Sequence, residues 1–437
     1  MNAAPDLELY ATYKPSGLDW LGDIPAHWAL VQLGRIGRFS KGSGGTKADE
    51  VPDGVPCIRY GDLYTSHKYH IRTSRSCVTE TNALNYTPLR FGDVLFAGSG
   101  ETIEEIGKSA VNLIEQPAVC GGDVILFRPE SELNAAFSGY AIDCPASQYQ
   151  KSTMGRGITV MHIYGSELKN LWLPLPPLPE QTAIARYLDH VDRRIQRYID
   201  TKEKLIALLQ EARQANIHRA VTRGLDPDVP LKPSGVDWLG DVPAHWEVRK
   251  LRYLAHITTG ERDTVDRKDD GKYPFFVRSQ TVERIDTWSY DGEAVLTAGD
   301  GVGVGKVFHY VNGKFDFHQR VYKFCDFGSV IGKFFFHYFK AMLRFEVLQG
   351  TAKSTVDSLR LPMLQNLPVA IPPLPEQRAI AAHLDKATDA IDAAIDTARR
   401  QADLMREYRA SLIAHVVTGK LDVRAAAEHI GMKTSYQ

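Results

Sequence analysis

Two lysines in a glycine- and serine-rich segment are the first candidates for binding chemistry in this chain. The segment reads K-G-S-G-G-T-K, with Lys41 at its start and Lys47 at its end. Lysine contacts phosphate groups, and a loop with so little side-chain bulk can approach a phosphate backbone closely. The same composition is also typical of a flexible, solvated linker. The segment therefore leaves phosphate binding and a linker role both open.

A second glycine-rich segment, T-A-G-D-G-V-G-V-G-K at residues 297–306, has to be distinguished from a nucleotide-binding loop. In a Walker-type loop, Gly-Lys is followed by Ser or Thr, whose hydroxyl binds Mg²⁺. Here Val307 follows Lys306, and the glycine spacing is met only because the segment is repetitive. We therefore predict a hairpin turn at these residues and no ATP site.

The residue types used in catalysis do not form a recognisable set. His67 and His70 are close in sequence but have no third metal ligand nearby. The chain has no N-P-P-F/Y motif of adenine methyltransferases and no glycine loop after a strand for S-adenosylmethionine. We therefore predict no catalytic, cofactor-binding or metal-binding residues and a chain that is not an enzyme. The alternative is an enzyme whose active site lies in one of the two regions that have no repeated counterpart, residues 35–169 and 252–365. Activity of the purified chain would reveal it.

The composition is that of an ordinary globular protein. Of the 437 residues, 43% are hydrophobic and 24% are charged, and this length suggests two to three domains. No apolar run is long enough to span a membrane, and residues 1–10 lack the apolar segment of a secretory signal. The five scattered cysteines indicate reduced thiols. We expect a cytoplasmic protein without membrane contact.

Two repeated blocks must position these segments. K-P-S-G-L-D-W-L-G-D-I-P-A-H-W starts at Lys14, and a nearly identical opening block starts at Lys232 (232 − 14 = 218). P-P-L-P-E-Q occurs at residues 176–181 and again at residues 372–377 (372 − 176 = 196). The repetition indicates a duplicated scaffold.

The regions between the blocks, residues 35–169 and 252–365, do not match one another. Both contain short Val-, Ile- and Phe-rich runs bounded by Gly, Asp and Asn, which predict β-rich domains. In the second region, V-N-G-K at residues 311–314 favours a hairpin turn, because Asn-Gly accepts positive φ. The repeated tryptophans are predicted to pack in the scaffold or bind a partner protein: Trp20, Trp28, Trp238 and Trp246.

Long helical patterns follow both P-P-L-P-E-Q blocks. Over residues 184–212, apolar or tolerated side chains recur at alternating spacings of four and three, and residues 380–408 keep the same register. Prolines mark the helix starts, while Gly224 and Gly419 mark the ends. Because a single apolar stripe needs a partner, we expect the two helices to form an antiparallel coiled coil. Packing of each helix on its own domain alone is the other interpretation.

The chain resembles the specificity subunits of Type I restriction–modification systems, the HsdS family. The resemblance is carried by the doubled opening block and by L-P-L-P-P-L-P-E-Q at residues 173–181, with its counterpart at residues 369–377 and the helices that follow. I-R-Y-G-D-L at residues 58–63 and G-D-V-L-F-A-G-S-G-E-T at residues 92–102 also resemble this family. It implies an α+β fold: two globular, β-rich mixed α/β target recognition domains joined by two long antiparallel coiled-coil helices in a pseudo-two-fold tandem repeat.

This resemblance divides the chain into five parts. We expect a first target recognition domain with its opening block at residues 1–175, the first helix at 176–224, the second domain with its block at 225–368, the second helix at 369–424, and a C-terminal tail at 425–437. Each domain is expected to read one half of an asymmetric bipartite DNA site. The coiled coil would set the spacing between the halves.

The resemblance also implies the partners. They are double-stranded DNA, two methyltransferase (modification) subunits docked on the conserved regions, and two restriction/translocase subunits. S-adenosylmethionine, ATP and Mg would be bound by those subunits and not by this chain. The competing interpretation is a coiled-coil interaction scaffold without DNA readout, for which the net charge of −1 is the support. A steep fall of DNA affinity with salt would separate the two.

DNA-binding candidates in the first region come from the family pattern. Two precede G-D-L, two lie in the turn after G-D-V-L-F-A, and three lie in K-S-T-M-G-R-G-I-T-V, where the family's chain returns toward DNA. They are Arg59 and Tyr60, then Ser99 and Lys108, then Lys151, Arg156 and Thr159.

Candidates in the second region come from matching it to the first. F-F-V-R-S-Q takes the place of C-I-R-Y-G-D, residues 297–306 take the place of F-A-G-S-G-E-T, H-Q-R follows a strand, and residues 350–355 correspond to residues 151–159. Arginine, lysine, glutamine and serine are residue types that contact base edges or phosphates. The candidates are Arg278, Ser279, Gln280, Lys306, Gln319, Arg320, Lys353 and Ser354.

Overall fold

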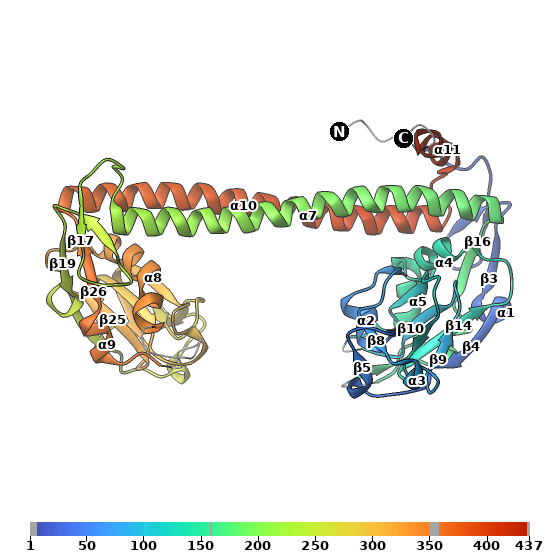
Figure 1. Cartoon of the computed structure of the whole chain (residues 1–437), viewed down its shortest axis with the longest axis horizontal. Coiled ribbons are helices and arrows are strands. Elements are labelled where there is room, and N and C mark those ends of the chain that lie inside the picture. The colour runs from blue at the N-terminus through green and yellow to red at the C-terminus, as the bar shows by residue number, and fades with distance from the viewer. Residues whose placement is uncertain (1–6, 101, 158–159, 349–357, 435–437) are drawn as a thin grey trace. The chain divides into compact units, whose positions relative to one another are not determined.

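The computed structural model describes the chain over residues 7–100, 102–157, 160–348 and 358–434. The chain folds as two compact units (Figure 1). The first consists of Met1–Thr201 with Gln401–Gln437, and the second of Lys202–Arg400. Each unit holds one of the two unmatched regions and a part of both long helices. No helix among the described residues is long and apolar enough to cross a membrane.

Two five-stranded sheets form the first domain. The first sheet has the order β4-β14-β10-β12-β7, with only the β12–β7 pair parallel. Its strands are β4 (Gly37–Lys41), β14 (Val124–Pro129), β10 (Val94–Ala97), β12 (Ser109–Asn112) and β7 (Tyr69–Ile71). The second sheet, in the order β5-β8-β6-β13-β9, consists of β5 (Glu50–Val51), β8 (Ser76–Val78), β6 (Val55–Ile58), β13 (Ala118–Cys120) and β9 (Thr87–Leu89).

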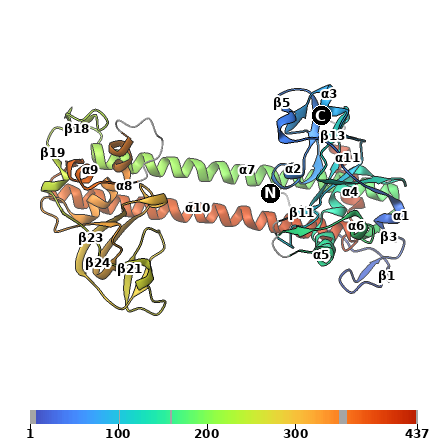
Figure 2. The same cartoon turned by 90° about the horizontal axis from the view of Figure 1, so that it is seen from below.

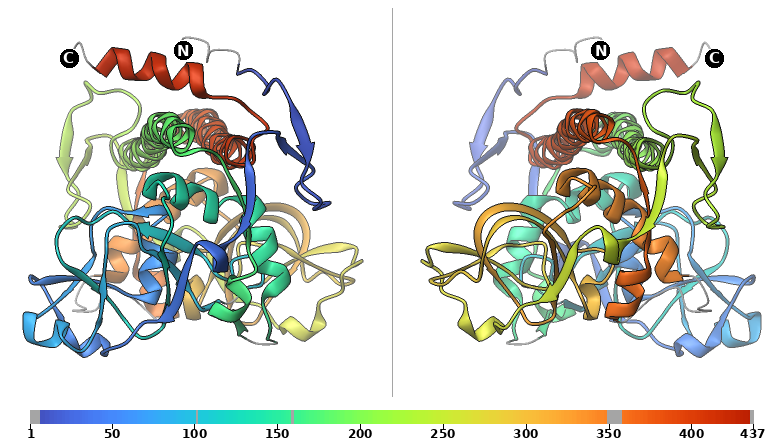
Figure 3. Two further views of the ribbon diagram at one scale, coloured as in Figure 1. Left: turned by 90° about the vertical axis from the view of Figure 1, so that its right-hand side faces the viewer. Right: turned by 90° about the vertical axis from the view of Figure 1, so that its left-hand side faces the viewer.

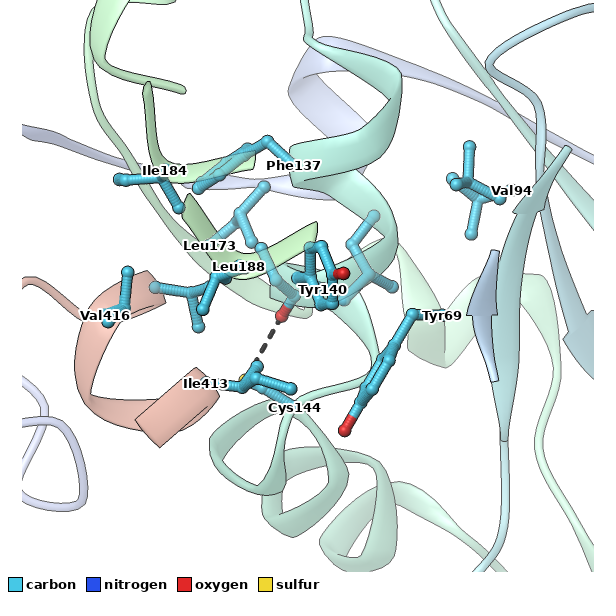
Figure 4. Close-up of a cluster of buried hydrophobic side chains, with 14 of the residues drawn as sticks. Tyr69, Val94, Phe137, Tyr140, Cys144, Leu173, Ile184, Leu188, Ile413 and Val416 are labelled. Carbon is cyan, nitrogen blue, oxygen red and sulfur yellow. Dashed lines mark hydrogen bonds between the residues drawn. The ribbon is translucent and has the colours of Figure 1, made fainter. Parts of the chain in front are cut away.

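Short helices surround these sheets, and α4 (Ala135–Ile142) packs on β12 and β7. Phe137 and Tyr140 of α4 share one buried cluster with Ile184 and Leu188 of the first long helix (Figure 4). The core of the domain is thus continuous with the helix. The remaining elements are α1 (Leu33–Ile36), η1 (Lys47–Asp49), α2 (Tyr60–Thr65), α3 (Glu80–Ala83), β11 (Ser99–Gly100), α5 (Pro145–Met154), β15 (Met161–His162) and α6 (Gly165–Leu168).

One six-stranded sheet forms the second domain. Its order is β20-β25-β23-β24-β21-β22, and only the β24–β21 pair is parallel. The strands are β20 (His256–Thr259), β25 (Val321–Cys325), β23 (Tyr290–Ala298), β24 (Phe308–Phe317), β21 (Tyr273–Phe276) and β22 (Glu283–Ile285). Around the sheet lie η2 (Leu251–Tyr253), η3 (Thr264–Asp266), η4 (Gly301–Gly303), α8 (Gly332–Leu348) and α9 (Leu361–Asn366).

The two domains share a strand order although their sequences do not match. β4-β14-β10-β12 corresponds to β20-β25-β23-β24, antiparallel throughout in both. β6 lies parallel to β13 as β21 lies parallel to β24, so F-F-V-R does take the place of C-I-R-Y. The predicted β-rich character of both regions is confirmed.

The hairpin turn predicted at residues 311–314 is wrong. β24 continues through these residues, with Asn312 paired to Glu293 and Gly313 paired to Gly292. The chain reverses instead at residues 299–307, between the antiparallel strands β23 and β24. Long-range pairing with β23 overrides the local turn preference of Asn-Gly. The reversal at 299–307 is the hairpin connection predicted there.

The repeated blocks form the same elements at the same offsets. In the opening blocks, β1 (Tyr13–Pro15) pairs with β2 (Asp23–Pro25), and β17 (Leu231–Pro233) pairs with β18 (Asp241–Pro243). The strand after each block pairs with the strand that leads into the long helix. These pairs are β3 (Ala29–Gln32) with β16 (Trp172–Leu175), and β19 (Glu247–Lys250) with β26 (Pro368–Ile371).

The long helices are α7 (Leu178–Arg223, 46 residues) and α10 (Leu374–Val417, 44 residues). Both end where predicted, before Gly224 and close to Gly419. These glycines have φ of +76° and +75°, a conformation that glycine adopts without steric cost. At Gly419 a Cβ atom would also lie 2.3 Å from Pro25 Cδ, so no larger residue fits there without movement.

The two helices run antiparallel, as predicted. Figure 2 shows α7 and α10 side by side. In the first unit the beginning of α7 lies against the end of α10, where Arg409 Nη1 donates a hydrogen bond to Gln196 Oε1 (2.8 Å). In the second unit, late α7 meets early α10, where Arg213 pairs with Asp392 (3.2 Å). Each helix also packs on a domain. Because the helices contact each other as well, the alternative of packing on a domain alone is wrong.

Beyond Ile195 the predicted register of the apolar stripe holds only in part: Tyr198, Lys202 and Leu209 are half-buried as predicted, but other predicted positions are exposed. Ile199 and Ile206 are buried or half-buried, whereas Leu205, predicted inside, is 40% exposed. On α10, Tyr408 is 47% exposed for the same reason. A strict seven-residue repeat has a period of 3.5, while a straight helix has 3.6 residues per turn. Over four heptads this difference moves the buried stripe by one residue.

The predicted C-terminal tail is mostly helical. α11 (Arg424–Thr434) lies on the side of the long helices opposite the sheets of the first unit (Figure 3). Val423 and Ala427 are fully buried in the same apolar cluster as Trp28. The backbone of Asp422 forms an antiparallel β-bridge with the backbone of Glu8 in the N-terminal segment. The resemblance carried no motif in this segment, so the prediction missed its packing.

One carboxylate fastens each opening block to its helix. Glu180 accepts hydrogen bonds from Trp28 Nε1 (3.1 Å) and His27 Nε2 (2.8 Å). Glu376 does the same with Trp246 Nε1 (3.2 Å) and His245 Nε2 (2.8 Å). Both glutamates lie in the first helical turn, where the helix dipole favours a negative charge. The prediction that these two tryptophans pack in the scaffold is confirmed, since both are 0% exposed.

The next residue of P-P-L-P-E-Q fastens the variable domain. Gln181 Oε1 accepts a hydrogen bond from the backbone N–H of Asn134 (2.9 Å), just before α4. Gln377 Oε1 accepts one from the N–H of Ile331 (2.8 Å), just before α8. Because the contact on the domain side is a backbone group, it does not depend on the variable side chains.

A second carboxylate, further along each long helix, contacts the variable domain through side chains that differ between the two repeats. Asp189 accepts hydrogen bonds from Tyr140 Oη (2.8 Å) and Arg72 Nη2 (3.0 Å). Its counterpart Asp385 pairs with Lys333 Nζ (2.7 Å) and His337 Nε2 (3.2 Å). The carboxylate is thus conserved between the repeats while its partners are not.

We predict that the stability of the second domain depends on pH through His337. Burial lowers the pKa of His337, and Lys333 and Lys340 also lower it, although Asp385 opposes this shift. The unfolded chain therefore binds the proton more strongly, and stability falls as pH drops below about 6.5, by at most about 1.4 kcal/mol per pH unit for one histidine. Thermal unfolding of H337Q between pH 7.5 and 5.5 should show a weaker pH dependence. H256Q, at an exposed histidine of this domain, is the control. Equal pH dependence in all three proteins would contradict the prediction.

Candidate nucleic-acid interface

Two adjoining hollows in the first domain collect most of the predicted residues there. Lys47, Arg59 and Tyr60 line a hollow of about 630 Å³. Lys41 and Ser99 line a second hollow of about 550 Å³. Asp123 lines both, so they share an edge. Residues from loops far apart in sequence are thus brought together because β4, β6 and β10 end near one another.

Two further cations in these hollows were missed by the sequence analysis. Arg75 lines the hollow of Lys47, and Lys169 lines the hollow of Lys41. Neither lies in a motif or a glycine-rich segment, so no local signal marked them. Together with the predicted lysines they give each hollow at least two cationic side chains.

Arg59 is held at the start of α2, directly after β6. Its Nη1 lies 3.7 Å from Glu50 Oε2, and the side chain is 20% exposed. Its Nη2 atom is buried and has no hydrogen-bond partner among the described residues. The backbone N–H of Arg59 donates to Asp62 (3.0 Å), which fixes the turn. Because Nη2 is buried, only the exposed part of the Arg59 side chain is accessible to a ligand.

Ser99 and Arg156 lie on neighbouring backbone segments. Ser99 of β11 pairs with His162 of β15, and His162 exchanges two backbone hydrogen bonds with Arg156 (2.7 and 2.9 Å). Arg156 is exposed. His162 lines the same hollow as Ser99, so this segment lies at the edge of that hollow. Thr159 lies outside the described residues.

Lys108 lies apart from these residues. It lines another hollow together with Glu104, Glu105 and Asp143, and it donates to the carbonyl of Tyr64 (3.3 Å). Three carboxylates around one lysine make this a poor place for a phosphate.

Lys151 is a correction, because it cannot reach a ligand in this structure. Its side chain is 0% exposed and donates to Gly107 O (2.8 Å), Asp143 Oδ1 (3.1 Å) and Ser109 Oγ (3.3 Å). Burial lowers the pKa of Lys151, while Asp143 opposes the shift. The ammonium group therefore stabilises the backbone at Gly107 and is not accessible to DNA in this structure.

In the second domain, two predicted arginines meet on one carboxylate. Arg278 Nη1 donates to Asp300 Oδ1 (2.9 Å), and Arg320 Nη1 donates to Asp300 Oδ2 (2.8 Å). Burial raises the pKa of Asp300, but the hydrogen bonds from both arginines outweigh it and leave this pKa below its ordinary value. Asp300 is therefore a carboxylate at neutral pH. It lies in the 299–307 connection and was missed by the sequence analysis.

The other predicted residues of this domain lie around the same connection. Ser279 and Gln280 follow Arg278 and are exposed, and Gln280 Nε2 donates to Phe308 O (3.4 Å). Lys306 is exposed near the end of the 299–307 connection. Gln319 donates to Asp263 Oδ2 (2.7 Å), so its amide is partly used. Lys353 and Ser354 lie outside the described residues.

A buried polar network supports this surface. Asp316, at the end of β24, accepts hydrogen bonds from Thr287 Oγ1 (2.8 Å), Ser289 Oγ (2.8 Å) and Arg262 Nε (3.3 Å). His318 Nδ1, two residues further on, accepts from the backbone N–H of Arg320 (2.9 Å). These satisfied groups hold the backbone beside Arg320 in one conformation.

Among the described residues, no group of three His, Cys, Asp or Glu side chains is arranged to hold a metal ion. His70, one of the two histidines considered above, donates instead to Ala136 O (2.9 Å). The chemistry available on both domains is that of exposed cations and hydrogen-bond donors.

A duplicated scaffold that carries two unlike domains, each with basic, exposed loops, defines a class of proteins with two separate recognition domains. A family model described as the Type I restriction modification DNA specificity domain matches residues 25–207 and 243–398. The two matches cover most of the chain, so this protein belongs to that family. Each match begins in an opening block, spans one unmatched region and ends within one long helix.

Individual relatives agree with this assignment. The chain is 25% identical over 446 residues to the Type I restriction enzyme MjaVIII specificity subunit of Methanocaldococcus jannaschii, covering 92% of this chain and 94% of that protein. A solved structure of the type I R-M system, concerned with its complex assembly and conformational transition, matches at a TM-score of 0.69 with 17% identity, over 90% of this chain and 98% of that one. The HsdS subunit from Thermoanaerobacter tengcongensis matches at 0.50 with 16% identity, over 91% and 98%. The predicted family and fold are confirmed.

We predict that Lys151 matters for stability and not for binding. K151M should destabilise the first domain by about 3–5 kcal/mol, because it leaves Asp143 without its buried countercharge. Denaturant unfolding of the full chain would measure this, and K151M/D143N should recover part of the loss. K47M, at an exposed lysine of the same domain, should cost less than about 0.5 kcal/mol. A stable K151M with altered DNA affinity would restore Lys151 as a contact.

Proposed function

We propose that this chain is the DNA sequence-specificity subunit of a Type I restriction–modification complex. Each variable domain reads one half of an asymmetric, bipartite site in double-stranded DNA. The observation that carries this is the equivalence of the two domains. The same strand order places the half-buried Arg59 after β6 and the exposed Arg278 after β21, among otherwise different side chains. Equivalent frames with different surfaces suit two different half-sites.

The scaffold has the other two roles in this proposal. The antiparallel pair α7–α10 sets the distance between the half-sites, and the conserved regions dock two methyltransferase subunits, which two restriction/translocase subunits join. The chain itself carries no catalysis. S-adenosylmethionine, ATP and Mg belong to the partner subunits. The alternative of a scaffold without DNA readout is less favoured, because it gives no reason for exposed arginines on both domains.

Modified-base sequencing tests the proposal directly. DNA from cells that express this chain with its methyltransferase subunit should carry modified bases at one split, asymmetric motif with a fixed gap. DNA from cells without this chain should lack them. A stable protein complex that leaves the DNA unmodified and binds it without salt dependence would favour the scaffold alternative.

Exchange of the second variable region should change half of the recognised motif. Residues 252–365 lie between β19 and β26, so a related region can replace them without disturbing the scaffold strands. The same sequencing experiment should then show one altered half and one unchanged half. The reciprocal exchange of residues 35–169 is the matched control and should alter the other half. Changes in both halves after one exchange would contradict independent reading.

Deletion of one heptad from each long helix, at facing positions, should shorten the unspecified gap and leave both half-sites unchanged. The physical reason is that seven residues span about 10.5 Å of helix and nearly two full turns, so the apolar stripe is almost restored. Deletion of five residues from each helix is the control, because it rotates the stripe away and should destabilise the helix pair. An unchanged gap after the heptad deletion would mean that the helices do not set the spacing.

A further inference from the structure

We propose that Asp300 is a positioning residue that holds Arg278 and Arg320 as a pair to recognise guanine bases in the half-site read by the second domain. This inference rests on the proposed function. It names the bases that the exposed surface of this domain selects and a residue that controls the selection.

Three separate segments converge to make this group. Arg278 follows β21, Asp300 lies in the β23–β24 connection, and Arg320 lies between β24 and β25. Each carboxylate oxygen accepts one hydrogen bond, from Arg278 Nη1 at 2.9 Å and from Arg320 Nη1 at 2.8 Å. One carboxylate thus fixes two guanidinium groups beside each other.

The backbone of the 299–307 connection is fitted to both arginines. The N–H of Gly299 donates to Arg320 O (2.8 Å). A Cβ atom at Gly303 would lie 2.8 Å from Arg278 O, and one at Gly301, where φ is +72°, would lie 3.8 Å from Arg278 Nη1. Glycine is therefore required where the connection passes closest to Arg278. The contacts tie Asp300 to the arginines through main chain as well as side chains.

Both arginines keep donors free for a ligand. Their side chains are 41% and 58% exposed, and each uses only Nη1 on Asp300. Among the described residues, their Nε and Nη2 atoms make no side-chain hydrogen bond. Arginine donates two parallel hydrogen bonds to O6 and N7 of guanine in the major groove. A guanidinium already held by a carboxylate loses less conformational freedom on binding.

The carboxylate also argues for bases over phosphates. Asp300 is 26% exposed and anionic, so a phosphate placed against this group would meet a like charge. A guanine edge presents neutral acceptors, and the paired cytosine presents an N4 amino donor that a carboxylate can accept. Val302, 91% exposed at the tip of the same connection, adds an apolar surface next to the group.

The test uses the full chain in complex with its methyltransferase subunit. Binding is measured for the cognate DNA and for duplexes in which each G·C pair of the second half-site is replaced in turn, at several salt concentrations. For D300N, discrimination against the replaced G·C pairs should fall about tenfold or more, while the salt slope stays that of the wild type. R278K and R320K should each relax selection at one base pair, because lysine cannot form the paired hydrogen bonds.

D286N is the matched control. It makes the same chemical change in the same domain, at an exposed carboxylate paired with Lys268 (2.6 Å), and it should leave discrimination unchanged. Base pairs of the first half-site are an internal control and should be read normally by every variant.

The possible outcomes distinguish a failure of this inference from a failure of the proposed function. A second half-site without G·C pairs, full discrimination by D300N, or an equal loss of affinity for all DNAs would overturn the role of Asp300 while DNA reading stands. A wild-type complex with no sequence preference at all would overturn the proposed function and this inference with it.

Discussion

The structure depends on a carboxylate at the start of each long helix, which is buried at Glu180 and half-buried at Glu376. Glu180 and Glu376 each hold an indole N–H and an imidazole from an opening block more than a hundred residues earlier in the chain. An unpaired indole N–H or carboxylate in this position would carry a desolvation cost of a few kcal/mol. The bonds therefore fix where each variable domain leaves and rejoins the scaffold, through β3–β16 and β19–β26.

Variation is confined to what lies between these fixed points. The strand order β4-β14-β10-β12 recurs as β20-β25-β23-β24 without sequence similarity, because apolar alternation and burial determine a sheet, whereas its loops are free to differ. In the first domain the cations line hollows, and in the second they are arranged around one carboxylate. Two recognition surfaces of different chemistry are thus built on one frame.

Much of this fold could be predicted from the sequence, because repetition is a strong signal. The offsets of 218 and 196 residues recur in the strands and helices, and the helix ends fall at the expected glycines. Sequence reasoning failed where distant contacts decide the outcome. Pairing with Glu293 extends β24 through Asn312, and the burial of Lys151 depends on Asp143 and Gly107. The role of Asp300 requires two arginines that lie 22 and 20 residues away in the chain, on other segments of the domain. None of these has a local pattern.

The contacts that hold each domain to its helix define the groups that a foreign domain must provide if it is grafted onto this scaffold. A foreign domain needs one free backbone N–H for Gln181 or Gln377, and one hydroxyl, imidazole or cationic side chain for Asp189 or Asp385. Tyrosine and arginine meet the second requirement in one repeat, and lysine and histidine meet it in the other. Because the scaffold contacts a type of donor and not a particular residue, we expect domains of unrelated sequence to be interchangeable as modules, with little adaptation of the helices.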